Sequence, residues 1–220
     1  MLMKIKIDGL EVEVSENETI LQVANRLGIR IPTLCYLEGI YEGASCRICV
    51  VELENGKLVP ACIHKVSDGL VVYTDTDRVR EARRVTLELL LASHRMECQS
   101  CPMKGNCVLA ELCSEYGVEG IPVCAECPLH GKDCLLNKGE VCLGPITMSG
   151  CKAKCPREKE VCEGCRGPIT RRDVLEYASK LYTDYDIPMK DVLNKLRNYC
   201  GSSREYDLVY QYMVSRRGEK

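Results

Sequence analysis

The chain begins with two short runs in which apolar and charged residues alternate. Lys4-Ile5-Lys6-Ile7 is the first run, Leu10-Glu11-Val12-Glu13-Val14 is the second, and Asp8-Gly9 stands between them. A period of two is typical of strands that bury one face, and Asp-Gly favours a two-residue hairpin turn. The pattern therefore predicts a β-hairpin over residues 4–14.

A helix and two further strands are predicted after this hairpin. From Thr19 to Leu27 the apolar residues recur at the spacing of one helical face, and Gly28 follows where a glycine commonly ends a helix. Apolar runs at 48–53 and 70–73 predict strands, with a turn at Asn55-Gly56. A hairpin, a helix and more strands indicate an α+β fold.

Helices are also predicted in the later parts of the chain. Residues 77–93 have Asp75 or Asp77 available as a cap and carry an apolar stripe, which consists of Val79, Ala82, Val85, Leu89 and Ala92, with Leu90 alongside. Further helices are expected over residues 108–116, 170–182, 188–199 and 206–214. The last three either cap the segment before them or offer a tyrosine-rich docking face to a partner.

Cysteine dominates the composition. The 220 residues include 17 cysteines but no Phe or Trp, the residues that contribute most buried area. Eight of the cysteines, with five glycines and three prolines, fall between Cys124 and Cys165. We expect no ordinary hydrophobic core in this segment, so bonds made by its sulfur atoms should set its shape.

The rest of the sequence limits which groups those sulfur atoms can bind. The alternating first nine residues are unlike a signal peptide, and the longest apolar run, 85–92, is interrupted by Thr86 and Glu88. We therefore expect a cytoplasmic protein without membrane insertion, where dense cysteines indicate metal rather than disulfides. The net charge of −2 offers no basic field for nucleic acid.

Four cysteines after the first helix form the first candidate ligand set. Cys35, Cys46, Cys49 and Cys62 are spaced C-x10-C-x2-C-x12-C, which differs from the plant-type ferredoxin spacing. A [2Fe–2S] cluster needs four such ligands, and the small residues at 43–45 let backbone amides approach its sulfurs. A zinc site with four cysteines is the alternative, although its usual form is two close pairs.

A histidine joins the second candidate set. His94 precedes Cys98, Cys101 and Cys107, and Pro102 follows the second of these cysteines. A neutral imidazole in place of one thiolate makes a cluster less negative, which raises its reduction potential. Without the three cysteines downstream, His94 would be read as a surface or capping histidine.

The central stretch supplies two more sets of four. Cys124, Cys127, Cys134 and Cys142 come first, and Cys151, Cys155, Cys162 and Cys165 follow Gly144-Pro145. Two sequential groups suit two [4Fe–4S] clusters, and Cys-Pro is a recurring element of bacterial cluster motifs. Two four-cysteine zinc sites are the less favoured alternative that the spacing leaves open. His130 lies inside the first group and is interpreted as a loop residue.

The order of the first eight candidate ligands resembles a known family. It is similar to the N-terminal part of the large iron–sulfur subunit of respiratory complex I, to the diaphorase iron–sulfur subunit of NAD-linked hydrogenases and to the N-termini of some formate dehydrogenases. The resemblance covers roughly residues 1–118. It implies a β-grasp ferredoxin domain that holds [2Fe–2S] and a one-histidine, three-cysteine [4Fe–4S] site. Cys113 has no place in that motif.

A second resemblance covers roughly residues 122–169. Cys142-Leu-Gly-Pro-Ile-Thr, Gly150-Cys151 and Cys162-Glu-Gly-Cys165-Arg-Gly-Pro168 are similar to the C-terminal half of the small subunit of cytoplasmic [NiFe] hydrogenases. By that likeness the set that begins at Cys124 holds the distal [4Fe–4S] cluster and the set that begins at Cys151 holds the medial one. The flavodoxin-like half of that subunit is missing, so the chain resembles a fusion of two cluster-bearing pieces.

Together these observations predict an α+β protein of four parts. They are a β-grasp [2Fe–2S] domain over 1–76, a histidine-ligated [4Fe–4S] domain over 77–121, a loop-rich two-[4Fe–4S] domain over 122–169 and a helical tail over 170–220. Fifteen cysteines and His94 make four sets, which leaves Cys113 and Cys200 unused.

The predicted function is electron transfer through one [2Fe–2S] and three [4Fe–4S] clusters. No G-x-G-x-x-G, P-loop or catalytic dyad is present, so we expect a non-catalytic subunit. Its expected partners are a flavin- and NAD(P)-binding diaphorase-type subunit or a ferredoxin, and the catalytic subunit of a hydrogenase, a formate dehydrogenase or another molybdenum or tungsten enzyme. The alternative is a zinc-rich scaffold or adaptor with no redox role.

Overall fold

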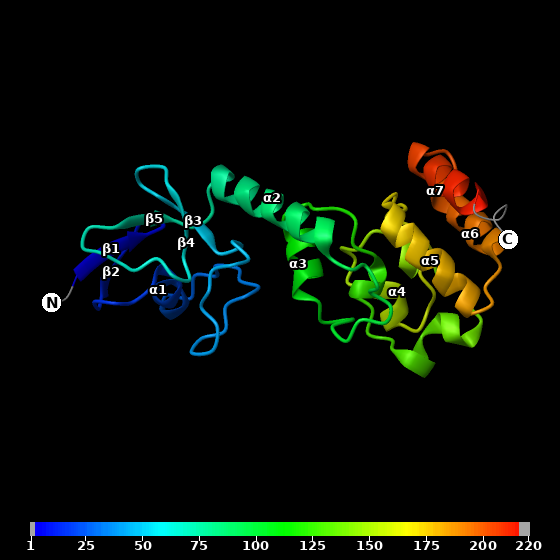
Figure 1. The fold of residues 1–220 in the computed structure, drawn as a ribbon, viewed down its shortest axis with the longest axis horizontal. Helices are drawn as coiled ribbons and strands as arrows, with labels where there is room; N and C mark the ends of the chain where they lie inside the picture. The colour runs from blue at the N-terminus through cyan, green and yellow to red at the C-terminus, as the bar shows by residue number, and fades with distance from the viewer. Residues whose placement is uncertain (1–2, 216–220) are drawn as a thin grey trace. The chain divides into compact units, whose positions relative to one another are not determined.

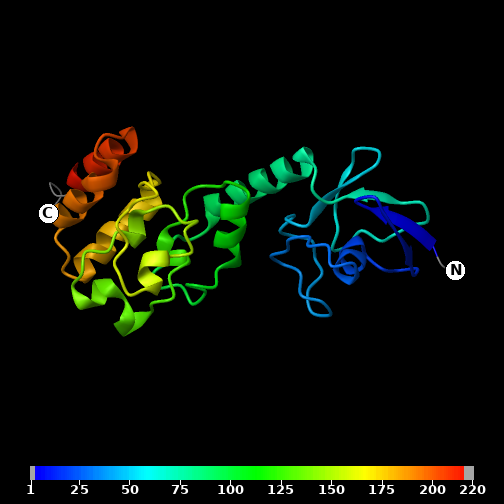
Figure 2. The same cartoon turned by 180° about the vertical axis from the view of Figure 1, so that it is seen from behind.

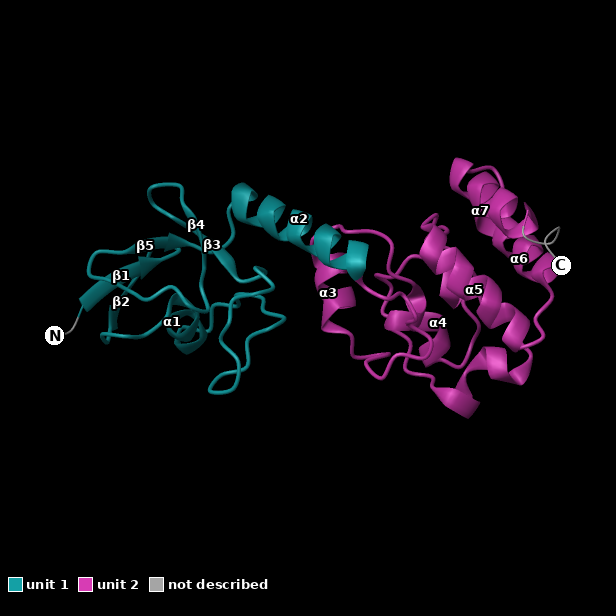
Figure 3. Ribbon diagram, viewed as in Figure 1, with its two compact units in different colours: residues 1–93 teal, residues 94–220 magenta. Residues whose placement is uncertain are grey.

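The computed structural model describes residues 3–215 and forms two compact units (Figure 3). The first unit comprises residues 1–93 and the second comprises residues 94–220. Each unit has its own hydrophobic core. In the described range, no helix combines the length and the apolar character needed to span a bilayer.

A five-stranded mixed sheet is the centre of the first unit (Figure 1). Its strands are β1 (Met3–Ile7), β2 (Leu10–Val14), β3 (Val50–Leu53), β4 (Leu58–Pro60) and β5 (Val71–Tyr73). The order across the sheet is β2-β1-β5-β3-β4. Only the β1–β5 pair is parallel, and the other three pairs are antiparallel.

The predicted hairpin is confirmed. Ile7 pairs with Leu10 at its end, and both turn residues have positive φ, 49° for Asp8 and 85° for Gly9. That conformation suits Asp-Gly because glycine has no Cβ to clash and aspartate tolerates the left-handed region. The turn at Asn55-Gly56 is also present, and it joins β3 to β4.

Helix α1 (Ile20–Arg26) covers the sheet and supplies much of the first core. Figure 2 shows it beside the strands from the opposite side. Thr19 and Gln22 form a capping box, in which each side chain bonds the other residue's backbone amide. Gly28 follows the helix with a φ of 73°, as the sequence predicted. The local sequence therefore determines both ends of this helix.

Helix α2 (Asp77–Ser93) has the predicted bounds but not the predicted face. The buried residues are Val79, Arg83, Leu87 and Leu91, whereas Val85 and Leu89 of the expected stripe are exposed. The reason is Arg83, whose guanidinium donates hydrogen bonds to the carbonyls of Val50 (2.8 Å) and Thr74 (3.0 Å). These bonds turn the face of the helix that contains Arg83 toward the sheet.

The N-terminal cap of α2 also differs from the prediction. The hydroxyl of Thr76 accepts a hydrogen bond from the amide of Val79 at 3.2 Å, so Thr76 takes the capping position. Asp75 instead pairs with Arg80, and Asp77 lies in the first turn of the helix. Asp75, Thr76 and Asp77 are adjacent and all three can cap a helix, so the sequence alone does not decide which of them does.

The second unit consists of helices and short 3₁₀ turns around the cysteine-rich segment. Its longer helices are α3 (Val108–Glu115), α5 (Arg172–Asp184), α6 (Met189–Cys200) and α7 (Arg204–Ser215). The short elements are η1 (Val123–Ala125), η2 (Gly131–Asp133), η3 (Leu135–Lys138), η4 (Gly144–Ile146) and α4 (Lys154–Arg157). The predicted helices at 108–116, 170–182, 188–199 and 206–214 are thus confirmed to within a few residues.

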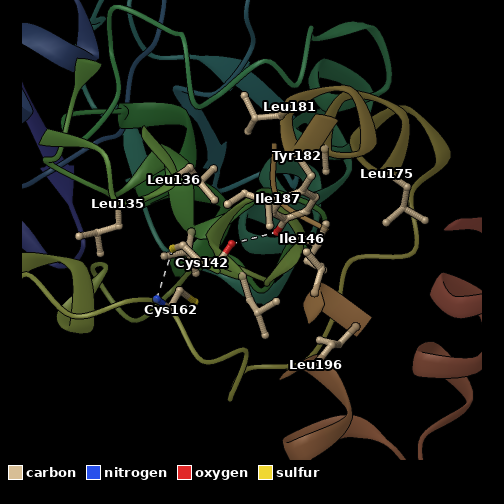
Figure 4. Packing of buried hydrophobic residues seen from close by; sticks show 14 of the residues in the cluster. Leu135, Leu136, Cys142, Ile146, Cys162, Leu175, Leu181, Tyr182, Ile187 and Leu196 are labelled. Atoms are coloured by element: carbon tan, nitrogen blue, oxygen red, sulfur yellow. Dashed lines mark hydrogen bonds between the residues drawn. The ribbon is translucent and has the colours of Figure 1, made fainter. Parts of the chain in front are cut away.

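The expectation that the cysteine-rich segment would lack a hydrophobic core is wrong (Figure 4). Leu135, Leu136, Leu143 and Ile146 are buried there, with the side chains of α5, α6 and α7 packed against them. The apolar side chains of these three helices cover the apolar side chains of the segment. The helices therefore cap the cysteine-rich segment, which is one of the two roles that the sequence suggested for them. The chain is therefore an α+β protein, with a five-stranded mixed sheet followed by a helical, cysteine-rich region.

Candidate metal centres

All 17 cysteines have free thiols, and most of them are buried or half-buried. Within residues 3–215, no three His, Cys, Asp or Glu side chains converge closely enough to hold a single metal ion. The thiols of the first and third sets lie near one another, whereas those of the second and fourth sets are brought together only in part.

The first set lies on the loops around β3 and β4. Cys49 and Cys62 are buried, whereas Cys35 and Cys46 are half-buried. Burial first, and then the neighbouring thiols of Cys49, Cys35 and Cys46, raise the pKa of Cys62 to about 12. The structure therefore brings all four thiols of this set near one another.

A backbone amide already points at one of these sulfurs. The amide of Cys46 donates a hydrogen bond to Sγ of Cys35 at 3.4 Å. Burial alone would raise the pKa of Cys35, but this bond and one from the Ser45 hydroxyl hold that pKa below its ordinary value. Ala44 and Arg47 have φ values of 49° and 59°, a strained conformation for residues with a Cβ. The loop is thus shaped to stabilise thiolate charge.

The second set is brought together in part. Cys98 is buried, and burial followed by the thiols of Cys107 and Cys101 raises its pKa to about 12. His94 is exposed at the start of the second unit and makes no hydrogen bond or ion pair with any described residue. The three thiols are therefore neighbours, whereas the His94 imidazole is exposed to solvent.

Cys113 is completely buried on α3, as the sequence suggested. Burial and then the nearby thiol of Cys107 raise its pKa to about 12. A thiol with such a pKa is protonated at neutral pH and is a poor nucleophile. Cys200, the other unassigned cysteine, is buried at the end of α6 and donates to the carbonyl of Gly164 at 3.7 Å.

The third set lines one cavity. Its walls are formed by 12 residues that include Cys124, Cys127, Cys134 and Cys142. The other lining residues are mostly apolar, among them Val123, Leu135 and Leu136 of the second core. Burial raises the pKa of the Cys124 thiol well above its ordinary value, and Lys104 is the largest influence in the opposite direction. Four thiols around one apolar cavity are suited to a thiolate-bound cluster.

The fourth set is more open. Cys162 is buried, Cys151 is half-buried, and Cys155 and Cys165 are exposed. Burial raises the pKa of Cys162 to about 12, and the thiol of Cys151 contributes to that shift. These two thiols are neighbours, while Cys155 and Cys165 lie at the surface of the second unit.

The third and fourth sets touch at two of their members. The amide of Cys162 donates a hydrogen bond to Sγ of Cys142 at 3.3 Å, and the amide of Leu143 donates to the carbonyl of Cys162 at 2.9 Å. The hydroxyl of Tyr182 on α5 donates to the carbonyl of Cys142 at 3.0 Å (Figure 4). A Cβ on Gly144 would lie 3.3 Å from Sγ of Cys124, so a glycine lets the chain pass close to the thiols.

Glu126 shapes the loop that leads to Cys151. Its carboxylate accepts hydrogen bonds from the amides of Gly150 (2.8 Å) and Ala153 (3.3 Å). Lys152 and Ala153 have φ values of 54° and 49°, so two successive residues adopt the left-handed conformation there. The carboxylate satisfies these two backbone amides and ties the fourth set to the loop of the third.

Sequence reasoning missed Lys104, Gln99, Glu126 and Tyr182. Lys104, Gln99 and Glu126 lie within cysteine motifs, where a charged or polar residue reads as part of a solvated loop, and Tyr182 lies on a predicted helix. No local signal distinguishes them, because their partners are distant in sequence. His130, in contrast, is an exposed loop residue before η2, as predicted.

Comparisons with known proteins match the N-terminal half. Residues 2–77 match the 2Fe-2S iron-sulfur cluster binding domain, and residues 83–122 match the NADH-ubiquinone oxidoreductase-G iron-sulfur binding region. An NADH-quinone oxidoreductase subunit of Rhizobium meliloti is 42% identical over 117 residues, which are 53% of this chain and 14% of that protein.

Hydrogenase proteins also match. NADP-reducing hydrogenase subunit HndD of Solidesulfovibrio fructosivorans is 44% identical over 127 residues, which are 55% of this chain and 22% of that protein. A crystal structure of an NAD+-reducing [NiFe]-hydrogenase in the H2-reduced state aligns at 30% identity with a TM-score of 0.49, over 52% of this chain and 49% of that chain. The chain thus spans less than a quarter of the length of the two relatives named by sequence.

The matched regions contain the first two cysteine sets. They establish binding of a [2Fe–2S] cluster and at least one [4Fe–4S] cluster. The C-terminal half has no family assignment. Residues 2–122 therefore form an iron–sulfur electron-transfer region like that of the NADH-quinone oxidoreductase relative and of the hydrogenase protein HndD.

Proposed function

We propose that the whole chain is a non-catalytic iron–sulfur subunit that relays electrons between a flavoprotein or ferredoxin and the catalytic subunit of an oxidoreductase complex. When bound, iron–sulfur clusters supply one-electron uptake and release. The chain's own residues hold those clusters, exclude water from them and set the charge around them.

The proposed ligands are the four sets of the sequence. In a β-grasp domain, Cys35, Cys46, Cys49 and Cys62 hold [2Fe–2S]. Three [4Fe–4S] sites follow: His94, Cys98, Cys101 and Cys107; Cys124, Cys127, Cys134 and Cys142; and Cys151, Cys155, Cys162 and Cys165. The last two sites account for the likeness of residues 122–169 to the two-cluster half of a hydrogenase small subunit.

One observation carries the proposal beyond the N-terminal half. The thiols of Cys124, Cys127, Cys134 and Cys142 come from four points of the sequence and line the same apolar cavity. Burial raises the pKa of the Cys124 and Cys142 thiols. Iron bound there would take the place of the thiol protons, and the ligand bonds would add to the free energy of folding.

Exposure supports a relay role for the first and the fourth site. Cys35 and Cys46 are only half-buried in the first unit, and Cys155 and Cys165 are exposed in the second. Redox centres held by such thiols lie near the protein surface, where a partner's redox centre can approach. The proposed partners are an NAD(P)- and flavin-binding subunit or a ferredoxin, and a hydrogenase, formate dehydrogenase or other molybdenum or tungsten subunit.

Anaerobic iron and sulfide analysis of the full chain, with EPR after dithionite reduction, tests the proposal. We expect about 14 irons per chain, from one two-iron and three four-iron clusters. About six irons per chain would mean that clusters bind only at the first two cysteine sets, in the N-terminal half. Stoichiometric zinc in the C-terminal cysteines would favour the scaffold alternative for that half of the chain.

A further inference from the structure

Lys104 is buried although it is charged. It lies between Cys101 and Cys107 in the second set, and only 2% of it is exposed. Lysine is almost never buried without a partner, because desolvating an ammonium group is costly. A negative group near this ammonium would offset that cost.

The place of Lys104 indicates where that negative charge lies. Lys104 lines the cavity of the third set together with Cys124, Cys127, Cys134 and Cys142. This places a lysine of the second cysteine motif beside the thiols of the third set.

Gln99 makes a second contact from the same motif. Its side-chain amide lies 3.7 Å from Sγ of Cys134 and donates to the Tyr185 hydroxyl at 3.1 Å. The backbones also meet, since the amide of Gly105 donates to the carbonyl of Ala125 at 2.8 Å. A Cβ on Gly105, whose φ is 84°, would lie 3.1 Å from the carbonyl oxygen of Cys127. The close packing fixes the loop of Lys104 against the loop of the third set.

We propose that Lys104 and Gln99 set the reduction potential of the cluster held by Cys124, Cys127, Cys134 and Cys142. The inference rests on the proposed function, because it requires a cluster in this cavity. One-electron reduction there adds one negative charge, with the electron delivered from the donor partner and no proton taken up. The ammonium of Lys104 and the N–H group of Gln99 stabilise that added charge, which raises the potential.

The two residues thereby couple neighbouring parts of the chain. Both come from the segment that matches the iron–sulfur binding region of NADH-ubiquinone oxidoreductase-G, and both act on a site in the half without a family assignment. A cation next to the third set makes electron acceptance there more favourable. Lys104 and Gln99 are positioning residues, because they act on the ligand thiols and their surroundings.

An EPR-monitored redox titration of the full, iron-loaded chain tests this inference. In Lys104→Met, which keeps the length of the side chain without its charge, we expect one [4Fe–4S] couple to become harder to reduce. The equilibrium constant for its reduction should fall at least tenfold, which corresponds to about 59 mV for a one-electron couple. Gln99→Leu should shift the same couple in the same direction by less.

Lys138→Met is the matched control. Lys138 is exposed in η3, between Cys134 and Cys142, so the variant loses the same charge close by in sequence. We expect every midpoint in this variant to match the wild type. Cys134→Ser identifies the affected couple, because its EPR signal is the one that this variant should lose or alter.

The outcomes separate the two proposals. A wild-type chain without a C-terminal [4Fe–4S] signal contradicts the proposed function before Lys104 is changed. Full iron content with unchanged midpoints in Lys104→Met, or a shift confined to a different couple, overturns the inference alone. If Lys104→Met does not retain iron, two other variants decide. Wild-type midpoints in Lys104→Arg, together with a lowered midpoint in Gln99→Leu, support the inference. An unchanged midpoint in Gln99→Leu overturns it.

Discussion

The backbone amide of Cys162 donates a hydrogen bond to Sγ of Cys142 at 3.3 Å (Figure 4). The two cysteines belong to different proposed ligand sets, so this bond joins the third site to the fourth through a single pair of residues. An amide that points at a ligand sulfur also stabilises negative charge on it. The contact is thus both a structural link and an electrostatic influence on the Cys142 site.

Serine substitutions test the grouping of the cysteines around this link. Because Cys142 and Cys162 are proposed to serve different clusters, Cys142→Ser and Cys162→Ser should each lose about four irons and a different EPR signal. Cys200→Ser is the control, since Cys200 is buried and assigned to no set. Iron analysis and EPR measure the result. Loss of the same signal in both variants, or of four irons in Cys200→Ser, would contradict the grouping.

His94 offers a test based on ligand charge. In His94→Cys, a thiolate replaces a neutral imidazole and makes the cluster one charge more negative. We expect the iron content to be kept and the midpoint potential of one [4Fe–4S] couple to fall. Redox titration measures the change. His130→Cys introduces the same residue at an exposed loop position and should leave all midpoint potentials unchanged. The same midpoint potentials in both variants would count against His94 as a ligand.

Tyr182 stabilises the wall of the third site from α5. Its side chain is completely buried, and burial raises its pKa well above the ordinary value, so the hydroxyl stays protonated as a donor to Cys142. Tyr182→Phe leaves the buried carbonyl of Cys142 without this partner, at a cost of about 1–3 kcal/mol.

Anaerobic urea unfolding of equally iron-loaded protein measures the effect of Tyr182→Phe as a lower midpoint. Tyr199→Phe is the matched control, because 59% of Tyr199 is exposed. Its midpoint should stay close to that of the wild type, with a change within about 0.5 kcal/mol. Equal midpoints for the two variants would show that the Tyr182 hydroxyl contributes nothing to stability.

Arg83 holds α2 on the sheet of the first unit. Arg83→Met retains the apolar stem but leaves the carbonyls of Val50 and Thr74 without their guanidinium donor. Each buried carbonyl left unsatisfied costs about 1–3 kcal/mol, so we expect clear destabilisation of the first unit. Urea unfolding followed by the visible circular dichroism of the [2Fe–2S] site measures it.

The neighbouring arginine is the control for this prediction. Arg84 pairs with Glu81 and Glu88 on the exposed side of the same helix. Exposed pairs contribute about 0–1 kcal/mol, so Arg84→Met should have a small effect. A larger loss in Arg84→Met than in Arg83→Met would mean that the surface pairs, and not the buried guanidinium, hold the helix.

Local signals in the sequence were sufficient for most elements of the fold. Asp8-Gly9 determined a hairpin because few other residue pairs adopt positive φ twice in succession. Thr19, Gln22 and Gly28 determined both ends of α1 for reasons that involve only neighbouring residues. Cysteine spacing likewise indicated the order of the four candidate sets, because ligands of one cluster often follow one another closely in sequence.

Tertiary structure alone decided which polar residues are buried and what they contact. The periodicity of α2 predicted an apolar face, yet Arg83 is buried because two carbonyls of the sheet accept its hydrogen bonds. Lys104 lies in a motif of ordinary loop composition and lines a cavity whose thiols begin 20 residues later in the chain. Sequence periodicity reports short-range geometry, whereas the environment of a buried charge depends on contacts between distant segments, which only the folded chain brings together.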